Sequence, residues 1–271
     1  MILINDTIIP AFIEDYTGQK RPVIEGLIVD RGWTAINVRA TINDIPELLD
    51  LILVIDLLEQ MHSANYPIYL YLWYLPIVRY QDEEPESSSS QESIIRTLLG
   101  SLDVDAIYLA AASSYMLELD NVINLSTADI ILNNPEVLKD INVIASVDSV
   151  SQYTAMMLAH SLNLKLIQIF NYIDNSSGRV IDTEILSGKT NIAGRDILLV
   201  GDVCYKSSLY TRSAEAMRHQ SKYKSVSMFT THGIYLDGID KLDKCFKNIY
   251  TTDSIYSQGG ETYERVTEVS I

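Results

Sequence analysis

The stretch DILLVGDVCYKSSLYTRSAEAMRHQSKYKSVSMFTT, residues 196–231, contains the pattern that decides the fold. DILLV at 196–200 and SVSMFTT at 225–231 are short runs of the kind that form buried strands. Between them, residues 201–209 predict a polar loop and residues 210–220 predict a helix. A strand, a helix and a second strand in this order predict parallel strands joined by a crossover helix, which is the unit of an α/β protein.

The same alternation is found along most of the chain. Apolar residues recur three or four apart in Ile45–Met61, which predicts a helix with one buried face. Other helices are expected at residues 92–102, at 151–162 and shortly after Pro135, and strands at residues 106–110, 141–147, 164–170 and 180–186. Because the alternation occurs twice, we predict two tandem α/β domains, each a mainly parallel sheet flanked by helices.

Three segments carry more specific expectations. The unbroken run IYLYLWYLPIV at residues 68–78 predicts a strand that is buried on both faces. Residues 81–93 contain no apolar residue, and therefore predict a solvated loop whose serines and acids could also serve phosphorylation or docking. Residues 171–178, NYIDNSSG, predict a turn or a mobile loop.

The charge of the chain limits its partners. The 271 residues include 20 Lys and Arg against 36 Asp and Glu, so the formal net charge is −16. A field of this sign repels nucleic-acid phosphates and anionic membrane surfaces, unless a local basic patch overrides it. We therefore expect no nucleic acid and no membrane among the partners.

The sequence predicts a soluble, cytoplasmic protein. Its two cysteines, Cys204 and Cys245, are too few for a disulfide framework and favour a reducing compartment. The longest nearly uncharged run, Tyr66–Val78, has 13 residues and two prolines, well short of the roughly 20 that span a bilayer. The N-terminal stretch MILINDTIIP has no basic residue, unlike a secretory signal.

Three strings resemble one enzyme family, the ribose-phosphate pyrophosphokinases, or PRPP synthetases, which have the type I phosphoribosyltransferase fold. They are ILLVGDVCYKSSLYTRSAEAM at 197–217, FTTHGIYLDGIDKL at 229–242 and NIYTTDSI at 248–255. The resemblance implies two phosphoribosyltransferase-like domains, at residues 1–136 and 137–271. The second would lack the helix that usually follows the last strand.

The resemblance also implies an activity, the transfer of a diphosphoryl group from ATP to ribose 5-phosphate with Mg²⁺. The family's phosphate loop has two acids at a strand end, a third acid, and a Thr-x-Gly-Thr cradle. The matching positions here are Gly201, Asp202, Tyr205 and the run Lys206-Ser207-Ser208-Leu209. The residual phosphate-loop candidates are therefore Asp202, Lys206, Ser207 and Ser208, which form either an altered anion site or a polar turn.

Two further functional segments of the family are changed in this chain. A metal-binding Asp-Leu-His triplet matches Ala111-Ala112-Ser113, in which alanine has no ligand for a hard cation. A catalytic Lys-Arg-Arg matches Asn171-Tyr172-Ile173, with Arg179 the nearest cation in the sequence. Loss of fixed positive charge from a phosphoryl-transfer site lowers its rate by orders of magnitude.

The fourth segment of the family contacts ATP through Arg-Gln-Asp. Here the chain reads Arg79-Tyr80-Gln81-Asp82, so the arginine is displaced by one position. On an extended segment such a shift turns the side chain to the other face. Arg79, Gln81 and Asp82 are the residual nucleotide-site candidates.

Other polar residues carry weaker signals. Asp148 matches an acidic position of the family, but a lone Asp after a strand is typical of a helix N-cap. His160 and His232 are expected to serve packing or lie at the surface, and no base is spaced to activate Cys204.

Taken together, these changes predict a catalytically inactive homologue, reused as a protein-binding adaptor or regulator. It would have no catalytic residue, no metal site and no cofactor, and would bind other proteins, as a homo-oligomer or with a paralogue. Two alternatives stay open. One is an active or substrate-shifted diphosphoryl or phosphoribosyl transferase that uses ATP and Mg²⁺, and the other is a nucleotide or sugar-phosphate sensor. The drift from the family pattern suggests a fast-evolving source, such as a virus.

Overall fold

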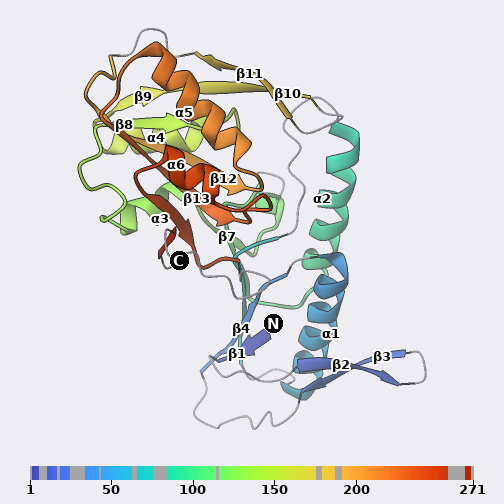
Figure 1. The fold of residues 1–271 in the computed structure, drawn as a ribbon. Helices are drawn as coiled ribbons and strands as arrows, with labels where there is room; N and C mark the ends of the chain where they lie inside the picture. The colour runs from blue at the N-terminus through green and yellow to red at the C-terminus, as the bar shows by residue number, and fades with distance from the viewer. Residues whose placement is uncertain are drawn as a thin grey trace. The chain divides into compact units, whose positions relative to one another are not determined.

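A computed structural model places two compact units along the chain, Met1–Leu125 and Ser126–Ile271 (Figure 1). It describes residues 2–5, 11–16, 19–24, 34–42, 44–62, 66–75, 85–113, 116–174, 179–186, 191–255 and 266–269. Both units are α/β, as the sequence predicts, and each has its own hydrophobic core. The boundary at residues 136 and 137 stays a prediction.

The N-terminal unit is built on one sheet with the strand order β1-β4-β5-β6-β7. Its strands are β1 (Ile2–Ile4), β4 (Ile36–Ala40), β5 (Ile68–Leu72), β6 (Ala106–Ala110) and β7 (Val122–Leu125). Only β1 runs antiparallel to its neighbour in this sheet. The unit also contains α1 (Ile45–His62), α2 (Pro85–Gly100), the short helix η1 (Met116–Glu118) and a hairpin of β2 (Ala11–Tyr16) and β3 (Gln19–Ile24).

Side chains of the N-terminal sheet alternate between a helix-covered face and an aromatic face. Leu70 and Leu72 of β5 are buried in the core together with Leu51 of α1. Tyr71 of the same strand is half-buried on the other face, where its ring stacks on Tyr108 with centroids 4.6 Å apart. The expectation that this strand is buried on both faces is therefore wrong, because Tyr69 and Tyr71 are only half-buried and the Tyr71 ring packs on Tyr108 of β6.

The C-terminal unit has an all-parallel sheet with the strand order β15-β14-β13-β12-β8-β9. Its strands are β8 (Val143–Ser146), β9 (Lys165–Ile167), β12 (Asp196–Cys204), β13 (Ser225–Gly233), β14 (Ile249–Thr252) and β15 (Val266–Val269). The helices are α3 (Thr127–Asn133), α4 (Gln152–Ser161), α5 (Ser208–Gln220) and α6 (Asp240–Cys245). A separate two-stranded arm consists of β10 (Ile169–Asp174) and β11 (Arg179–Ile185).

The chain reverses its direction across this sheet between two neighbouring strands. From β8 it moves outward to β9, whereas from β12 it moves the other way to β13. Right-handed crossovers then place α4 and α5 on opposite faces, and in Figure 1 α5 lies in front of the sheet and α4 behind it. The carboxyl ends of β8 and β12 meet at this switch point, which is where open α/β sheets bind ligands.

Three sequence predictions are wrong in detail. Residues 85–93 are the first part of α2 and not a loop, and Pro85 suits the first position of a helix. The segment after Pro135 forms turns instead of a short helix. Asn171 to Asp174 belong to β10, where pairing with β11 extends the strand.

No helix among the described residues is long and apolar enough to cross a membrane. The expected cytoplasmic location stays a prediction.

Candidate functional site

The candidate site lies at the carboxyl end of β12, beside β8 at the switch point of the C-terminal sheet. Val200 of β12 is in register with Ser146 of β8, so the segments that follow these strands are neighbours. The segment after β12 consists of Tyr205, Lys206 and Ser207, and α5 begins at Ser208. The structure thus brings three of the four residual phosphate-loop candidates to the start of one helix.

Asp202, the fourth candidate, lies within β12 because that strand continues to Cys204. Pairing of Val203 with His232 and of Cys204 with Gly233 extends the parallel ladder past the predicted end of the strand. The Asp202 carboxylate accepts a hydrogen bond from Thr127 Oγ1 at 2.7 Å. It is therefore turned toward the first residue of α3.

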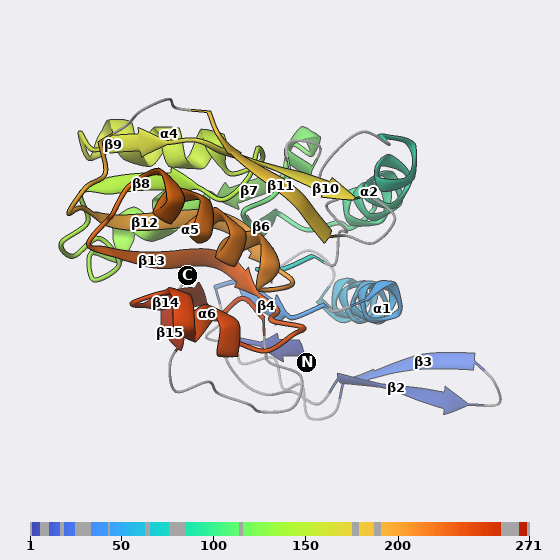
Figure 2. The same cartoon turned by 45° about the horizontal axis from the view of Figure 1, so that its top comes forward.

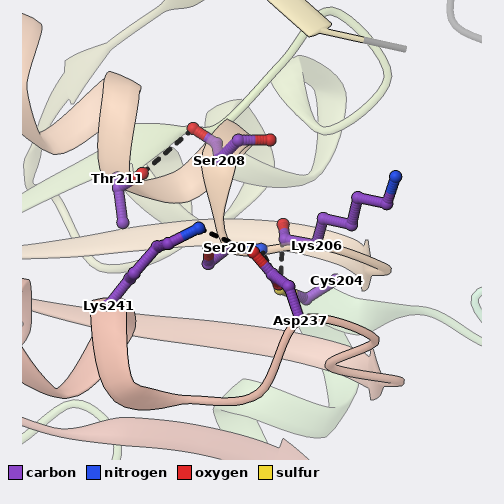
Figure 3. A network of polar contacts seen from close by, with 7 residues as sticks. All are labelled: Cys204, Lys206, Ser207, Ser208, Thr211, Asp237 and Lys241. Carbon is purple, nitrogen blue, oxygen red and sulfur yellow. Dashed lines mark hydrogen bonds and ion pairs between the residues drawn. The ribbon is translucent and has the colours of Figure 1, made fainter. Parts of the chain in front are cut away.

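Ser207 is the centre of the segment, and its polar groups are taken up by the chain itself (Figure 3). It is completely buried. Its backbone N–H donates to Asp237 Oδ1 at 2.8 Å and its hydroxyl donates to Asp237 Oδ2 at 2.6 Å. The ammonium group of Lys241 lies 3.3 Å from the same Oδ2. A carboxylate thus occupies the N-terminal end of α5, where the helix dipole favours negative charge.

The surroundings of Asp237 keep it ionised. Partial burial alone would raise its pKa, but the hydrogen bonds from Ser207, together with Lys241, outweigh this and hold the pKa of Asp237 below its usual value. The contact between Asp237 and Ser207 is thus a charge-assisted pair of hydrogen bonds at neutral pH.

Backbone hydrogen bonds fix the loop that carries Asp237. The N–H groups of Ile234 and Tyr235 both donate to the Cys204 carbonyl at 3.0 Å, and Leu236 N–H donates to the Tyr205 carbonyl at 2.7 Å. Gly238, directly after Asp237, has φ +71°, a conformation that glycine adopts without strain. The loop after β13 is thereby tied to the segment after β12.

Lys206 and Ser208, the other two candidates in this segment, differ in their surroundings. Lys206 is exposed, and Figure 3 shows its side chain extending away from Asp237. Ser208 is half-buried, and its carbonyl accepts a hydrogen bond from Thr211 Oγ1 at 3.2 Å within the first turn of α5.

Gly201 leaves room for a side chain from α5. A Cβ atom at this position would clash with the hydroxyl of Tyr210 and lie 2.6 Å from Val147 Cγ1. Tyr210 is fully buried, and burial raises the pKa of its hydroxyl far above the usual value, so it stays neutral. Gly201 and Tyr210 are therefore a packing pair in which the aromatic side chain uses the space that an acid would need.

The carboxylate in the segment after β8 is also hydrogen-bonded within the chain. Asp148 is 9% exposed, and its Oδ1 accepts from the Ser151 backbone N–H at 2.8 Å and from the Ser151 hydroxyl at 2.7 Å. The carboxylate holds the tight turn that leads into α4. The N-cap of α4 is Ser151, so Asp148 bonds to the N-cap residue and is not itself the N-cap that the sequence suggests.

Of the residues that match the family's other segments, Ala111, Ala112 and Asn171 bond to neighbouring parts of the chain. In the N-terminal unit, Ala111 N–H donates to the Leu125 carbonyl, and Ala112 N–H donates to Asn124 Oδ1, each at 2.9 Å. Ser113 Oγ is buried and has no hydrogen-bond partner within the described part of the chain. In the C-terminal unit, Asn171 is 2% exposed and donates to the Val147 carbonyl at 2.6 Å.

The nucleotide-site candidates Arg79, Gln81 and Asp82 lie outside the described residues. So does the Arg179 side chain, although its backbone is part of β11.

Sequence reasoning missed a buried polar network at the ends of β13 and β14. His232 Nδ1 lies 2.8 Å from Ser254 Oγ, and that hydroxyl donates to the Thr231 carbonyl at 3.0 Å. Both side chains are buried, and their contact joins the end of β13 to the segment after β14.

Sequence reasoning also missed Asp237. Its signals are Gly238, typical of a turn, and Lys241 four residues later, but its pairing with Ser207 joins residues 30 apart. Among the described residues, no three His, Cys, Asp or Glu side chains are grouped so that they could hold a metal ion.

The two units define an α/β protein with two phosphoribosyltransferase-like domains, in agreement with a solved structure of this fold. Phosphoribosylpyrophosphate synthetase from Mycobacterium smegmatis superposes with a TM-score of 0.73 over 97% of this chain and 87% of its own, at 17% identity. At this identity the likeness establishes a PRPP synthetase-like fold.

Two solved phosphoribosyltransferases match part of the chain. The adenine phosphoribosyltransferase (APRTase) of Giardia lamblia, complexed with 9-deazaadenine, is 14% identical and covers 52% of this chain and 77% of its own, with a TM-score of 0.39. The purine phosphoribosyltransferase of Pyrococcus horikoshii Ot3 is 13% identical and covers 62% and 93%, with a TM-score of 0.34. Both scores lie below 0.5, so the fold assignment rests on the synthetase. No protein-family model matches the sequence, and no curated protein matches it.

Proposed function

We propose that this protein is a catalytically inactive relative of the PRPP synthetases that acts by binding other proteins, as an adaptor or regulator. One observation carries the proposal. The carboxylate of Asp237 accepts both hydrogen bonds that Ser207 donates at the start of α5, at 2.8 and 2.6 Å. The chain itself supplies the anion at the place where the resemblance puts the phosphate of a sugar.

A phosphate would have to displace this carboxylate. It would accept the same two hydrogen bonds that Asp237 already accepts, so it would gain no new donors at Ser207. The released carboxylate would also stay close to the incoming anion and repel it. Lys206 is the one cation of the candidate set, and its exposed charge is screened by solvent.

The pair of Gly201 and Tyr210 supports the same proposal. An acid at residue 201 could not be accommodated without moving the fully buried Tyr210 ring. The space beneath the end of β12 is therefore filled for packing. Asp202, the acid next in sequence, is engaged by Thr127 of α3.

The protein-binding half of the proposal rests on charge and on the fold. A net charge of −16 keeps the chain soluble and selects against polyanionic partners such as nucleic acid and anionic membranes. The expected partners are other proteins, as copies of this chain, as a paralogue that retains activity or as an unrelated protein. ATP and Mg²⁺ would be cofactors only if the chain were an active or substrate-shifted transferase.

Calorimetry tests the proposal directly. The protein is titrated with ATP and with ribose 5-phosphate, each with and without Mg²⁺, and we expect no binding heat in any of the four titrations. Asp237→Asn, which removes the charge and keeps the shape, is titrated beside Asp240→Asn, which removes an exposed carboxylate nearby. Mg²⁺-dependent binding of either compound by the unchanged protein would overturn the proposal and favour a transferase or a sensor.

A further inference from the structure

The β10–β11 arm has two chemically different faces, and its inner face is anchored. Ile169 and Asn171 point inward and are buried. The Asn171 amide donates to the Val147 carbonyl at 2.6 Å and to Ser213 Oγ at 3.1 Å, and its oxygen accepts from Thr183 Oγ1. The arm is therefore fixed to the end of β8 and to α5 by a buried side chain.

The outer face of the arm combines aromatic rings with carboxylates. The register of the two strands pairs Phe170 with Glu184 and Tyr172 with Asp182, so these four side chains share one face. The two rings meet edge to face with centroids 4.9 Å apart. Figure 2 shows β10 and β11 running side by side as a two-stranded ribbon.

This outer face is open to solvent. Tyr172 is 45% exposed, and Leu186, which follows Glu184 on the same face, is 48% exposed. Asp182 and Glu184 are both exposed. The Tyr172 hydroxyl donates to Glu184 Oε2 at 3.1 Å, and Asp182 Oδ1 accepts from the Thr183 backbone N–H at 2.8 Å. These contacts hold the two carboxylates beside the rings, with lone pairs left over.

We propose that the outer face of the β10–β11 arm, formed by Phe170, Tyr172, Asp182, Glu184 and Leu186, is a docking surface for a protein segment rich in arginine and apolar residues. The proposal rests on the protein-binding role inferred above and names its surface and the chemistry of its partner.

Charge complementarity selects this partner. A guanidinium group pairs with carboxylates through its planar fork and also stacks on aromatic faces, so arginine satisfies both components of this surface. Apolar side chains of the same segment cover Leu186 and the ring edges. The net charge of −16 adds long-range attraction for a basic partner. A second copy of the chain would bring the same two carboxylates face to face and be repelled.

The test uses the 271-residue chain and a synthetic peptide in which arginine alternates with leucine. Fluorescence anisotropy measures its affinity for the unchanged protein, for Asp182→Asn/Glu184→Gln and for Tyr172→Ser. The matched control, Glu136→Gln/Glu268→Gln, removes the same charge from two exposed positions elsewhere in the unit. A second peptide, with glutamate in place of arginine, tests the sign of the charge.

We expect Asp182→Asn/Glu184→Gln to weaken arginine-peptide binding about tenfold, because two ion pairs are lost. Tyr172→Ser should weaken it several-fold through loss of stacking. The control should change it less than about twofold. An equal loss of affinity in the control would show that net charge alone attracts the peptide, and it would overturn the proposal. Unchanged affinity in both arm variants would also overturn it. So would tighter binding of the glutamate peptide, or self-association of the chain through the arm.

Turnover of ATP and ribose 5-phosphate, measured on the same samples, separates the two proposals. Turnover by the unchanged protein contradicts the inactive role. If the protein shows no turnover and the arm variants bind the peptide as tightly as the unchanged protein, only the proposed docking surface is contradicted.

Discussion

The start of α5 and the outer face of the β10–β11 arm differ in how the chain treats its own polar groups. At the start of α5, the donors of Ser207 are satisfied internally by Asp237, and the space next to Gly201 is filled by Tyr210. On the arm, Asp182, Glu184 and the Tyr172 ring are exposed. A polar site whose partners come from the same chain stabilises the fold, whereas a fixed and exposed polar face is available to another molecule.

The PRPP synthetase-like fold and the contacts of the matching segments have to be considered separately. The fold is of that kind, yet fold alone does not define function. The segments expected to bind phosphate and to carry catalytic cations hold residues that bond to their own surroundings, such as Ser207 with Asp237 and Asn171 with Val147.

Introducing an acid at residue 201, next to Tyr210, should have the largest effect on stability. Gly201→Asp places a Cβ atom against Tyr210 and Val147 and buries a charge, so we expect a loss of about 3 kcal/mol or more in the free energy of unfolding. Urea unfolding measures the change.

The double variant Gly201→Ala/Tyr210→Phe serves as its control. Removing the hydroxyl relieves the closest clash, so Gly201→Ala should be less destabilising in the Tyr210→Phe protein than in the unchanged one. An equal loss in both would show that the two residues do not form a packing pair.

Removing the Asn171 side chain, which fixes the β10–β11 arm, should have the next largest effect on stability. Asn171→Ala leaves buried polar groups without their partner, and we expect a loss of about 2 kcal/mol. Hydrogen exchange should become faster in β10 and β11. Tyr172→Ala, at the outward-facing neighbour, should leave exchange at the base of the arm unchanged. Unaltered exchange in Asn171→Ala would mean that the arm is held by other contacts.

Removing the internal anion should have a moderate, pH-dependent effect. Asp237→Asn replaces a charged acceptor at a helix N-terminus, so we expect a loss of about 1 kcal/mol at pH 7. The pKa of Asp237 is lower in the folded than in the unfolded state, so its stabilisation is present above the unfolded pKa of about 3.9 and is lost as the pH falls further.

The stability of the unchanged protein and of Asp237→Asn should therefore converge below about pH 4. Urea unfolding at pH 7 and in acid measures the difference, with Asp240→Asn as the control for an exposed acid. A difference that does not depend on pH would show that the charge of Asp237 plays no part.

Changes to the outer face of the arm should have the smallest effect on stability. Asp182 and Glu184 are exposed, so Asp182→Asn/Glu184→Gln should leave the urea midpoint unchanged while it weakens peptide binding. A large shift of the midpoint would mean that these carboxylates stabilise the fold and would contradict the contrast between the two regions.

The sequence predicts much of the fold because apolar runs and helical spacing are local signals. DILLV forms the buried start of β12, and Ile45–Met61 forms nearly all of α1. The sequence does not predict the start of α2, because the serine-rich first turns of this helix carry no apolar stripe. The sequence predicts the end of β12 too early, because pairing with β13 extends the strand through polar and small residues.

The candidate site is only partly predictable, because some of its residues act through contacts between segments distant in the sequence. Asp202, Lys206, Ser207 and Ser208 follow from position within a motif, and the structure places all four at the end of β12 or the start of α5. The role of Asp237 depends on a contact between two loops, and that of Tyr210 depends on the absence of a Cβ atom at Gly201. Neither relation is visible in one sequence.

The central claim, that this chain fills its own phosphate site and has no synthetase activity, is tested most directly by following AMP release. The protein is incubated with ATP, ribose 5-phosphate and Mg²⁺, with the Asp202→Asn variant in parallel. The account predicts no AMP above the enzyme-free blank for either protein. Mg²⁺-dependent AMP release that requires ribose 5-phosphate and is lost in Asp202→Asn would contradict it.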